Sequence, residues 1–474
     1  MIAPARVAAF QVLAAISAGG TDLASALDDV RARLADPRDR ALVTDIVTGV
    51  QRWRGAIDHL IVTLARRPLA KLDAEIVEIL RLSIYQLLHL TRVPAAAVVD
   101  DAVNLAGKAG KKSARPFVNA VLRSISRQRK ALPLPTRPED PARDRDATLT
   151  YLSTTLSHPR WLVERWLDRY GFAATEQWLQ FNNSAPPLTL RANGLRTTVD
   201  ALEQALRAAD VDCERGRWAP AALRIGERGQ GETLERLHDQ FVVQDEASQL
   251  VSLLAGASPG RRLLDTCASP GGKTTALATL QPRQLVACDV RDRRIQLLRR
   301  TLVQAGAIGN APLAATTDPV SPVHPVDIVQ ADLRQPLPFR PVFDCVLVDA
   351  PCSGLGTLRR DPDIKWRREP GDLASLAAAP RTMLAHAAAV VAPGGHLVYA
   401  TCSSEPEENE AIAADFAARS RFVRINAAVM HAGLAPALLD ADGALHTTPP
   451  QHQLEAFYGV VFQRPAGPAA PTNL

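Results

Sequence analysis

The sequence predicts a multidomain protein, with an all-helical part at the N-terminus and an α/β part in the second half of the chain. Two patterns support this prediction. Apolar residues recur at helical spacing over residues 1–130, and from residue 241 onward strand-like segments alternate with helical ones. A proline-rich segment separates the two parts. The chain has 474 residues, of which 47% are hydrophobic and 22% charged, so it is long enough for several packed domains.

The first 130 residues are predicted to form a set of packed helices. Asp36-Pro37 is typical of a helix start, because an Asp cap precedes a proline at the first helical position. Apolar side chains with helical spacing follow in four segments. They are Leu42, Val43, Ile46, Val47 and Val50; Ile76, Ile79, Leu80, Tyr85, Leu87 and Leu88; Val98, Val99 and Val103, after Pro94; and Phe117, Val118, Val121, Leu122 and Ile125.

Residues 131–149 are predicted to be an exposed linker, because four prolines lie there among charged residues. Residues 150–240 are predicted to be a small mixed subdomain, and residues 465–474 a disordered tail. Between them, residues 241–464 are predicted to form an α/β domain with a mostly parallel sheet. Its expected strands are Arg262–Cys267, Gln284–Val290, Asp327–Asp332, Phe343–Asp349, His396–Cys402, Phe422–Ile425 and Phe457–Phe462.

Positive charge is concentrated in the helical part. Residues 1–130 contain 20 Lys and Arg against 12 Asp and Glu, whereas the whole chain has a net charge of +5. Residues 108–130 contain no acidic residue and carry a basic stripe: Lys108, Lys111, Lys112, Arg115, Arg123, Arg127, Arg129 and Lys130. Such a stripe suits a phosphate backbone. A solvated helix face explains it equally well.

The six cysteines form no Cys-x-x-Cys pair and no cluster with histidine, so no metal site is expected. Long intracellular enzymes keep such thiols reduced, and the expected location is the cytoplasm. No apolar run reaches the roughly 20 residues that span a bilayer, so no membrane is expected as a partner. Near the N-terminus, Phe10, Leu13 and Ile16 have the spacing of a buried helix face, an interpretation favoured over a signal peptide.

A glycine-rich loop, Asp265-Thr-Cys-Ala-Ser-Pro-Gly-Gly-Lys-Thr-Thr275, follows an apolar strand and opens a helix. Its end resembles a P-loop, but the first P-loop glycine would fall at position 267, which is Cys. The G-x-G-x-x-G dinucleotide pattern is absent as well. What remains is a turn in which Gly271 and Gly272 let the backbone approach a ligand closely.

Three carboxylates are predicted at the ends of consecutive strands: Asp265, Asp289 and Asp332. Asp289 lies 24 residues after Asp265, where a carboxylate accepts hydrogen bonds from ribose hydroxyls. Each Asp alone is equally explained by a helix cap or a turn, whereas a helix cap or turn is a poor explanation for all three together. They suit a ligand that contains adenosine but no pyrophosphate, and S-adenosylmethionine fits that description.

Two cysteines are predicted at the carboxyl ends of two later strands. Cys352 follows Asp349 in a proline-containing turn, and Cys402 ends the segment Gly394–Ser403. Because reacting groups gather at the carboxyl ends of strands in open α/β sheets, both thiols, Asp349 and the glycine-rich loop are expected in one crevice. The other cysteines are expected to be inert: Cys213, Cys288 and Cys345 as buried hydrophobes, and Cys267 as part of the cofactor loop.

A thiol at this place suits methylation of cytosine. Addition of a thiolate to carbon 6 of the ring makes carbon 5 nucleophilic enough to attack a sulfonium methyl group. An acid at ring nitrogen 3 stabilises that adduct, a role that suits Asp349. The turn Asp-Ala-Pro-Cys lacks the aromatic residue that adenine methylases use for stacking, which favours a pyrimidine. These arguments leave open which thiol attacks.

Asp349-Ala-Pro-Cys-Ser-Gly354 together with Thr401-Cys402-Ser403 resembles the paired signature of the Sun family of RNA cytosine carbon-5 methyltransferases. The loop Cys267-Ala-Ser-Pro-Gly-Gly-Lys273 is similar to that family's cofactor loop, with Ser269 in place of the usual Ala. Residues 359–366 and 244–249 also match family segments. The segment between Asp289 and Asp332, which includes Ala311–Pro325, is longer than the family pattern.

The N-terminal part resembles the helical RNA-binding domain of the antitermination factor NusB. Four segments carry this resemblance: Gly49–Arg54, Leu80–Leu88, Val93-Pro94 and Phe117–Arg123. A NusB-like domain joined to a Sun-family domain is similar to bacterial methyltransferases of small-subunit ribosomal RNA. The resemblance therefore implies a Rossmann-like class I methyltransferase domain, an RNA-binding role for the helical and mixed domains, and a 16S ribosomal RNA (rRNA) substrate. The protein is expected to be monomeric.

The resemblance also implies roles for individual residues. Cys402 is the expected nucleophile, and Cys352 is expected to help release the methylated product. S-adenosylmethionine or the reacting base is expected to contact Cys267, Ala268, Ser269, Pro270, Gly271, Gly272, Lys273, Asp289, Asp332 and Asp349. Two alternatives stay open at this point. One is cytosine methylation of another nucleic acid such as transfer RNA, and the other is a non-catalytic RNA-binding or antitermination protein.

Overall fold

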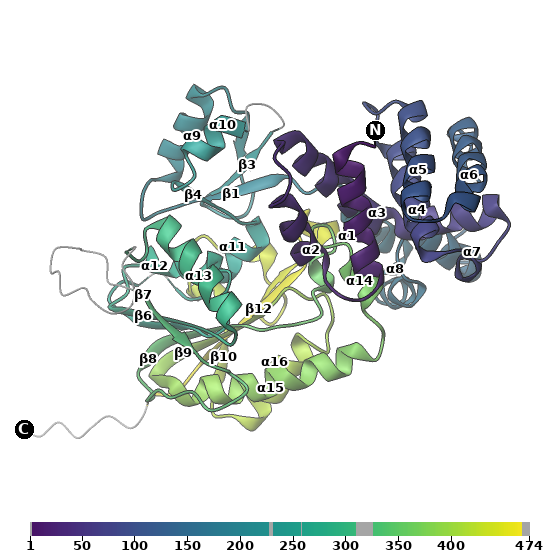
Figure 1. Cartoon of the computed structure of the whole chain (residues 1–474). Helices are drawn as coiled ribbons and strands as arrows, with labels where there is room; N and C mark the ends of the chain where they lie inside the picture. The colour runs from purple at the N-terminus through teal and green to yellow at the C-terminus, as the bar shows by residue number, and fades with distance from the viewer. Residues whose placement is uncertain (1, 227–230, 257, 310–325, 467–474) are drawn as a thin grey trace, which may run out of the picture. The chain divides into compact units, whose positions relative to one another are not determined.

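The computed structural model describes residues 2–226, 231–256, 258–309 and 326–466, and its elements are labelled in Figure 1. The chain folds into two compact units. One, here called the helical unit, comprises Met1–Ala185 and Thr357–Pro370; the other, the sheet unit, comprises Pro186–Gly356 and Gly371–Leu474. The long proline-rich segment 311–325 and most of the predicted tail, residues 467–474, lie outside the described residues.

The helical unit has the predicted all-helical structure. Its α-helices are α1 (Pro4–Ser17), α2 (Leu23–Arg31), α3 (Pro37–Ala65), α4 (Ala74–His89), α5 (Ala95–Lys108), α6 (Arg115–Gln128), α7 (Arg145–Thr150), α8 (Arg160–Asn183) and α14 (Ile364–Arg367). Shorter helical turns are η1 (Leu69–Lys71), η2 (Lys112–Ala114) and η3 (Tyr151–Thr155). The Asp36 side chain caps α3 by accepting a hydrogen bond from Arg38 N, as the sequence predicts. The apolar stripes of α1 to α6 pack into one core.

The predicted linker does not separate the two compact units. Leu132 and Leu134 pack against the core of the helical unit. Two backbone carbonyls of the segment are also hydrogen-bonded: Pro133 O lies 3.0 Å from His59 Nε2, and Pro135 O accepts from Thr155 Oγ1 at 2.6 Å. The division falls instead between Ala185 and Pro186. The boundary between compact units depends on which residues are in contact in space. Composition shows only that the segment is rich in proline and charged residues.

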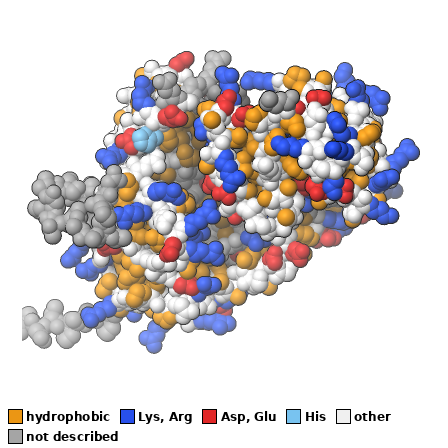
Figure 2. Space-filling model, in the orientation of Figure 1, with side chains coloured by type: hydrophobic (Ala, Val, Ile, Leu, Met, Phe, Trp, Pro, Cys, Tyr) orange, Lys and Arg blue, Asp and Glu red, His pale blue; other side chains and the backbone are white. Residues whose placement is uncertain are grey.

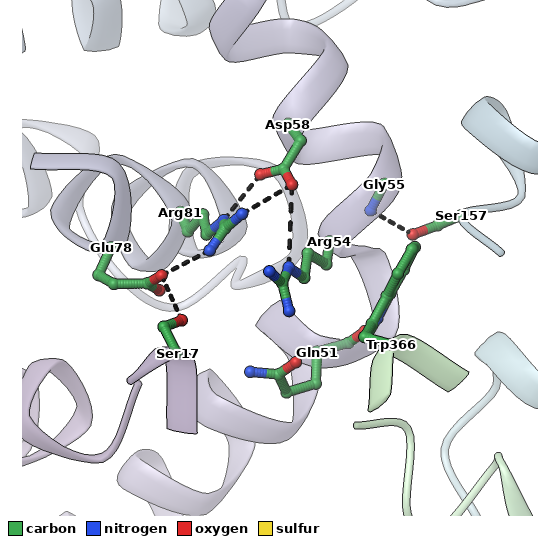
Figure 3. A network of polar contacts seen from close by, with 9 residues as sticks. All are labelled: Ser17, Gln51, Arg54, Gly55, Asp58, Glu78, Arg81, Ser157 and Trp366. Carbon is green, nitrogen blue, oxygen red and sulfur yellow. Dashed lines mark hydrogen bonds and ion pairs between the residues drawn. The ribbon is translucent and has the colours of Figure 1, made fainter. Parts of the chain in front are cut away.

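A buried network of charges joins α1, α3 and α4 of the helical unit (Figure 3). Arg81 donates to both carboxylate oxygens of Asp58, at 2.7 and 2.8 Å, and also to Glu78. Ser17 donates to the same oxygen of Glu78 at 2.7 Å, and Arg54 lies 3.8 Å from Asp58. The charges in this network are matched by neighbours on adjacent helices, which is the arrangement expected of a structural network.

A short segment of the later chain, Thr357–Pro370, belongs to the helical unit. Trp366 Nε1 donates to Gln51 O at 2.6 Å (Figure 3), and Lys365 Nζ donates to Arg52 O at 2.9 Å. Lys365 is 1% exposed and lies on α14. The segment that resembles the Sun family at residues 359–366 is therefore held by the second half of α3, around the NusB-like residues 49–54.

The sheet unit begins with a small antiparallel sheet. Its strands β1 (Leu188–Ala192), β2 (Cys213–Arg215), β3 (Ala222–Ile225) and β4 (Phe241–Val243) lie in the order β2-β3-β1-β4. Helices α9 (Val199–Ala208) and α10 (Gly231–Arg236) belong to the same part (Figure 1). Residues 186–226 and 231–240 of the subdomain predicted at 150–240 therefore have mixed structure, while residues 150–185 are mainly helical and pack in the other unit.

The large sheet has the order β10-β12-β9-β8-β5-β6-β7, with β11 paired to β12. Neighbours from β9 to β7 are parallel, and β10, β11 and β12 add antiparallel pairs at one side. The strands are β5 (Arg262–Asp265), β6 (Gln284–Asp289), β7 (Val326–Gln330), β8 (Phe343–Asp349), β9 (Val391–Thr401), β10 (Val423–Ile425), β11 (Leu445–Thr447) and β12 (Phe457–Gln463). The predicted fold class is confirmed, and β11 is a strand that the sequence did not predict.

Helices cover both faces of the large sheet (Figure 1). Alternate residues of each strand enter different cores: on β8, Leu347 packs with α11 (Glu246–Leu253), α12 (Gly272–Ala278) and α13 (Asp292–Ala305), whereas Val346 and Val348 pack with α15 (Asp372–Val390) and α16 (Glu410–Arg419). Short turns η4 (Leu355–Thr357), η5 (Ala427–Val429), η6 (Pro436–Leu438) and α17 (Pro449–His452) complete the described elements. No helix among the described residues is both long and apolar enough to cross a membrane.

Candidate active site

Four neighbouring parallel strands end at polar residues. Asp265 ends β5, Asp289 ends β6, Asp349 ends β8 and Thr401 ends β9. Because these strands run in one direction, all four ends lie along the same edge of the sheet. Cys402 follows β9 directly, so the predicted thiols and carboxylates are positioned by strand ends rather than by long loops.

The two predicted thiols meet at this edge. Cys352 Sγ lies 3.4 Å from Cys402 Sγ, and both cysteines are free. The hydrogen bond with Cys352 and burial raise the pKa of Cys402 well above the ordinary value of a thiol, while the nearby Lys273 opposes that shift. The resting form of Cys402 at neutral pH is therefore the thiol, which must lose a proton before it can act as a nucleophile.

A lysine and a carboxylate form an ion pair beside the thiols. Lys273 Nζ donates to Asp349 Oδ2 at 2.6 Å, and their side chains are 13% and 26% exposed. Burial by itself lowers the pKa of Lys273, but the charge and hydrogen bond of Asp349 outweigh it, so the net shift is upward. Lys273 is therefore an ammonium ion, whose charge also favours the thiolate of Cys402.

The glycine-rich loop between β5 and α12 is held by two buried carboxylates. Thr274 Oγ1 donates to Asp265 Oδ2 at 2.7 Å, and Ser269 N donates to Asp289 Oδ2 at 3.0 Å. Gly271 adopts the left-handed conformation, with φ of 112°, where a side chain would be strained. The backbone of the loop is thereby fixed at the strand ends.

Asp265 is a buried acid with an unusual pKa. It is 1% exposed, and burial raises its pKa to about 7, against an ordinary value of 3.8. Its second oxygen, Oδ1, is buried and has no hydrogen-bond partner of good geometry among the residues that the structure describes. A buried acceptor of this kind is expected at a place where a ligand supplies the missing donor.

Asp289 and Asp332 differ in what surrounds them. Asp289 is 4% exposed and accepts hydrogen bonds from the loop at Ser269 N and from Arg294, whose side chain also donates to Ser269 O. Asp332 follows β7, which ends two residues earlier at Gln330. Its carboxylate is held by the side chain of Arg334, which is also the main cause of its lowered pKa. Asp332 is thus partly exposed and locally paired.

The remaining predicted cysteines are buried or unreactive. Cys213, Cys288 and Cys345 are buried, as the sequence predicts. Burial raises the pKa of Cys288 and of Cys345 to about 12, so both stay protonated at neutral pH. Cys267 is partly exposed, yet desolvation raises its pKa as well, which fits a loop residue that does not react.

Sequence reasoning missed two features of the site. Arg191, on β1 of the small sheet, donates to Gly272 O at 3.0 Å and to Thr275 Oγ1 at 2.6 Å, so it binds the first turn of α12. Glu408 accepts hydrogen bonds from residues that directly follow each thiol. The signal for Glu408 was hidden, because the acidic run Glu405–Glu410 looks like an exposed surface segment.

The helical unit contains a separate cavity of about 640 Å³ between α5 and α6. Arg115, Arg123 and Arg127 of the predicted basic stripe line it, beside one acid, Asp100. None of these three arginines forms an ion pair within the part of the chain that the structure describes; Arg115 and Arg123 each donate to an asparagine. In the view of Figure 2, several Lys and Arg side chains lie on the right, where Figure 1 places α4 to α6.

Comparisons with known proteins agree with this architecture. Residues 252–463 match the family described as 16S rRNA methyltransferase RsmB/F, and residues 3–127 match the NusB family. The chain is 32% identical to the probable ribosomal RNA small subunit methyltransferase B of Bacillus subtilis, over 79% of this chain and 79% of that protein. It is 32% identical to the ribosomal RNA small subunit methyltransferase B of Pseudomonas syringae, over 91% and 90%.

The chain belongs to the RsmB/F family. The predicted resemblance is thereby confirmed. A third match, over residues 158–230, is to the ferredoxin-like domain of RsmF/B-like methyltransferases and includes β1 to β3. The RsmB/F match itself spans the glycine-rich loop, the strand-end carboxylates and both thiols, while the NusB match ends within α6.

Solved structures share the fold of this RsmB/F chain. One crystal structure superposes with a TM-score of 0.76 at 22% identity, covering 98% of this chain and 99% of the other. A methyltransferase homolog protein from Pyrococcus horikoshii gives a TM-score of 0.54 at 23% identity, over 67% and 99%. NSun6 from the same organism, solved with SFG, gives 0.52 at 17% identity, over 65% and 98%.

Proposed function

We propose that this RsmB/F chain transfers a methyl group from S-adenosylmethionine to carbon 5 of a cytosine in 16S rRNA, through a covalent adduct between Cys402 and carbon 6 of the base. The observation that carries the proposal is the meeting of two free thiols, 3.4 Å apart, beside the ion pair of Lys273 and Asp349. The 16S rRNA substrate follows from the description of the family and from the names of the relatives.

The strand ends fit S-adenosylmethionine. The fit rests on a backbone that comes close at Gly271, on the unpartnered buried oxygen of Asp265, and on the carboxylate of Asp289 at the next strand end. Residues 267–273, Asp289 and Asp349 would hold the cofactor together with Asp265. Asp332 follows β7, which is two strands away from β5 in the sheet, and joins them only as a proposal from the family resemblance. When bound, the cofactor supplies an electrophilic methyl group.

The thiol of Cys402 is the proposed nucleophile. After it loses its proton, the thiolate forms a bond to carbon 6, and the pair of electrons of the 5,6 double bond moves so that carbon 5 can attack the methyl group. Lys273 favours the thiolate by its positive charge. Asp349, the carboxylate of the ion pair with Lys273, would take up the proton that Cys402 releases and hold it at ring nitrogen 3, which stabilises the adduct.

Cys352 is the proposed release residue. A base accepts the proton on carbon 5, the electron pair of that bond restores the 5,6 double bond, and Cys402 leaves carbon 6 as its thiolate. A second thiol 3.4 Å away is close enough to take part in this step. For the RNA itself, we propose a contact at the cavity between α5 and α6, because Arg115, Arg123 and Arg127 line it and form no ion pair with any described residue.

The test is methyl transfer from labelled S-adenosylmethionine to 16S rRNA by three cysteine variants. Cys402→Ala should lose about 10³-fold or more in rate and still bind the cofactor. Cys352→Ala should accumulate a protein–RNA adduct that survives denaturing electrophoresis. Cys345→Ala is the matched control, since Cys345 is a buried thiol inside β8, and it should transfer methyl groups at nearly the wild-type rate.

Three results would contradict the proposal. Full turnover by Cys402→Ala would exclude this residue as the nucleophile. Bisulfite sequencing of small-subunit rRNA from a strain without the protein tests the substrate: an unchanged cytosine pattern would exclude 16S rRNA and point to another RNA. Absence of cofactor binding by the wild-type protein would favour a non-catalytic RNA-binding role.

A further inference from the structure

Each of the two thiols is followed directly by a buried serine. Ser353 follows Cys352 and is 0% exposed, and Ser403 follows Cys402 and is 1% exposed. Their hydroxyl oxygens lie 3.2 Å apart, close to the 3.4 Å between the two sulfur atoms. The serines therefore form a second, deeper contact between the turns that carry the thiols.

One carboxylate holds both serines. Glu408 is 0% exposed. Its Oε1 accepts from Ser353 N at 2.7 Å, and its Oε2 accepts from Ser353 Oγ at 2.6 Å and from Ser403 Oγ at 2.5 Å. A carboxylate oxygen accepts hydrogen bonds, and these three donors of the described chain all come from the two cysteine turns.

Hydrogen bonds to the backbone of Glu408 and to Asn409 hold the turn that carries the Glu408 carboxylate. Tyr399 on β9 donates from its hydroxyl to Glu408 O at 2.5 Å. The neighbouring Asn409 donates to Ser403 O at 2.9 Å and accepts from Thr401 Oγ1 at 2.5 Å. The turn is thus held through Asn409 as well as through the backbone of Glu408, so the carboxylate stays in place when the Tyr399 contact alone is lost.

We propose that Glu408 is the positioning residue that sets the distance between Cys352 and Cys402, by binding Ser353 and Ser403 at once. Glu408 touches neither thiol and acts through the serines. A misplacement of about 1 Å in a reacting group costs roughly 10²-fold in rate, so a residue that fixes two reacting groups has a large effect on turnover without joining the chemistry. The link to turnover rests on the proposed function of the thiols.

The first experiment measures methyl transfer by Glu408→Gln and Glu408→Ala in the full chain. Glutamine keeps one acceptor oxygen and the shape of the side chain. Its NH2 group, however, is a donor, so a serine hydroxyl that faces it has to accept a hydrogen bond instead of donating one. We expect kcat to fall roughly 10-fold for Glu408→Gln and roughly 100-fold for Glu408→Ala, with the KM for RNA within about twofold of wild type. A loss of kcat in proportion to the folded fraction would overturn the proposal.

The second experiment needs neither RNA nor S-adenosylmethionine. One molecule of oxidised glutathione converts the two thiols into a disulfide and becomes two molecules of reduced glutathione, so electrons and protons balance. The equilibrium constant for the Cys352–Cys402 disulfide measures how closely the folded chain holds the two sulfur atoms. We expect it to change about 10-fold or more in both Glu408 variants, as measured by mass spectrometry of the linked peptides.

Tyr399→Phe is the matched control. It removes one buried hydrogen bond to the backbone of Glu408 and leaves the carboxylate and both serines in place. It should lower thermal stability, yet leave the disulfide equilibrium constant within about twofold of wild type. Glu408 variants that fold and keep the wild-type disulfide constant would overturn the proposal. If the wild-type protein transfers no methyl group, the proposed function fails, while the disulfide constants still decide the role of Glu408.

Discussion

Lys273 and Lys365 are two lysines removed from solvent, one in each compact unit, and their pKa values shift in opposite directions. Lys273, in the sheet unit, lies 2.6 Å from the carboxylate of Asp349, and its pKa is raised. Lys365, in the helical unit, is 1% exposed and donates to Arg52 O, while Asn183 Oδ1 lies 3.5 Å away. Burial and the charge of Arg52 lower its pKa well below the ordinary value.

The difference between the two lysines separates the effect of burial on a lysine pKa from the effect of a carboxylate partner. Removal from water disfavours an ammonium ion, and carbonyl oxygens do not compensate for the lost hydration, so Lys365 is driven toward the neutral amine. A carboxylate at hydrogen-bond distance reverses the outcome for Lys273. A charge is therefore retained beside the thiols, whereas the helical unit uses its lysine as a hydrogen-bond donor inside the fold.

The largest expected effect is the loss of kcat when the charged Lys273 is replaced. Lys273→Met should lower kcat for methyl transfer about 10²- to 10³-fold, because the proposed site loses the cation that favours the Cys402 thiolate and pairs with Asp349. Lys273→Arg, which keeps the charge, should recover part of the rate. Single-turnover kinetics at saturating RNA give the measurement. A Lys273→Met protein that keeps kcat within twofold would show that this charge is as structural as Lys365.

A second prediction concerns Lys365, whose pKa is lowered by burial and by the charge of Arg52. The folded-state pKa of Lys365 lies below the ordinary value of 10.5, so in the window between them the unfolded chain binds a proton that the folded chain does not. Stability contributed at this position therefore rises with pH across that window. Wild type should gain stability over Lys365→Met as pH increases toward 10, to a difference of about 1–3 kcal/mol from the lost hydrogen bonds.

Urea unfolding followed by tryptophan fluorescence measures this difference in the full chain. Trp53, Trp161, Trp166, Trp178 and Trp366 lie in the helical unit, so the signal reports mainly on that unit. Arg92→Met, a substitution of an exposed basic residue on the same unit, is the control and should show no such pH dependence. A stability gap between wild type and Lys365→Met that narrows as pH rises would mean that Lys365 stays charged in the folded protein.

The sequence was sufficient for features that depend on local pattern. Apolar segments located β5, β6, β8 and β9, and the ends of these strands were enough to predict that Cys352 and Cys402 lie together. Features that depend on distant partners were not predictable. Lys365 binds a carbonyl 313 residues earlier in the chain, and nothing in its own segment indicates a helical neighbour. The boundary between the compact units was missed for the same reason, since residues 131–185 are defined by what they pack against.

Glu408 illustrates a different limit of sequence reasoning. It lies in the run Glu405-Pro-Glu-Glu-Asn-Glu410, whose composition is typical of an exposed segment. In the structure Glu405 and Glu408 are both 0% exposed, because serine hydroxyls and backbone amides replace the water around Glu408. Composition indicates only that acidic residues are exposed on average. A buried acidic residue such as Glu408 is recognisable only from the hydrogen-bond donors that surround it.

The smallest expected effect extends the comparison to an acid. If burial shifts Lys365 toward the neutral amine, it should also shift Asp265 toward the neutral acid. Burial raises the pKa of Asp265 to about 7 from an ordinary 3.8, although the charge of Lys273 opposes this shift. Here the sign is opposite: between pH 3.8 and 7 the folded chain holds a proton that the unfolded chain has released, so this stability is present at low pH and lost as pH rises through 7. Asparagine imitates the protonated acid and can still accept from Thr274.

Asp265→Asn should therefore gain about 1–3 kcal/mol of stability over wild type between pH 5 and pH 8, measured by calorimetry on the cofactor-free full chain. Asp289→Asn is the matched control, because Asp289 ends the next strand but has Arg294 and Ser269 N as donors; it should destabilise the protein at both pH values. If Asp265→Asn is equally destabilising at pH 5 and pH 8, Asp265 is ionised throughout. Burial would then not be enough to neutralise Asp265 at this edge of the sheet.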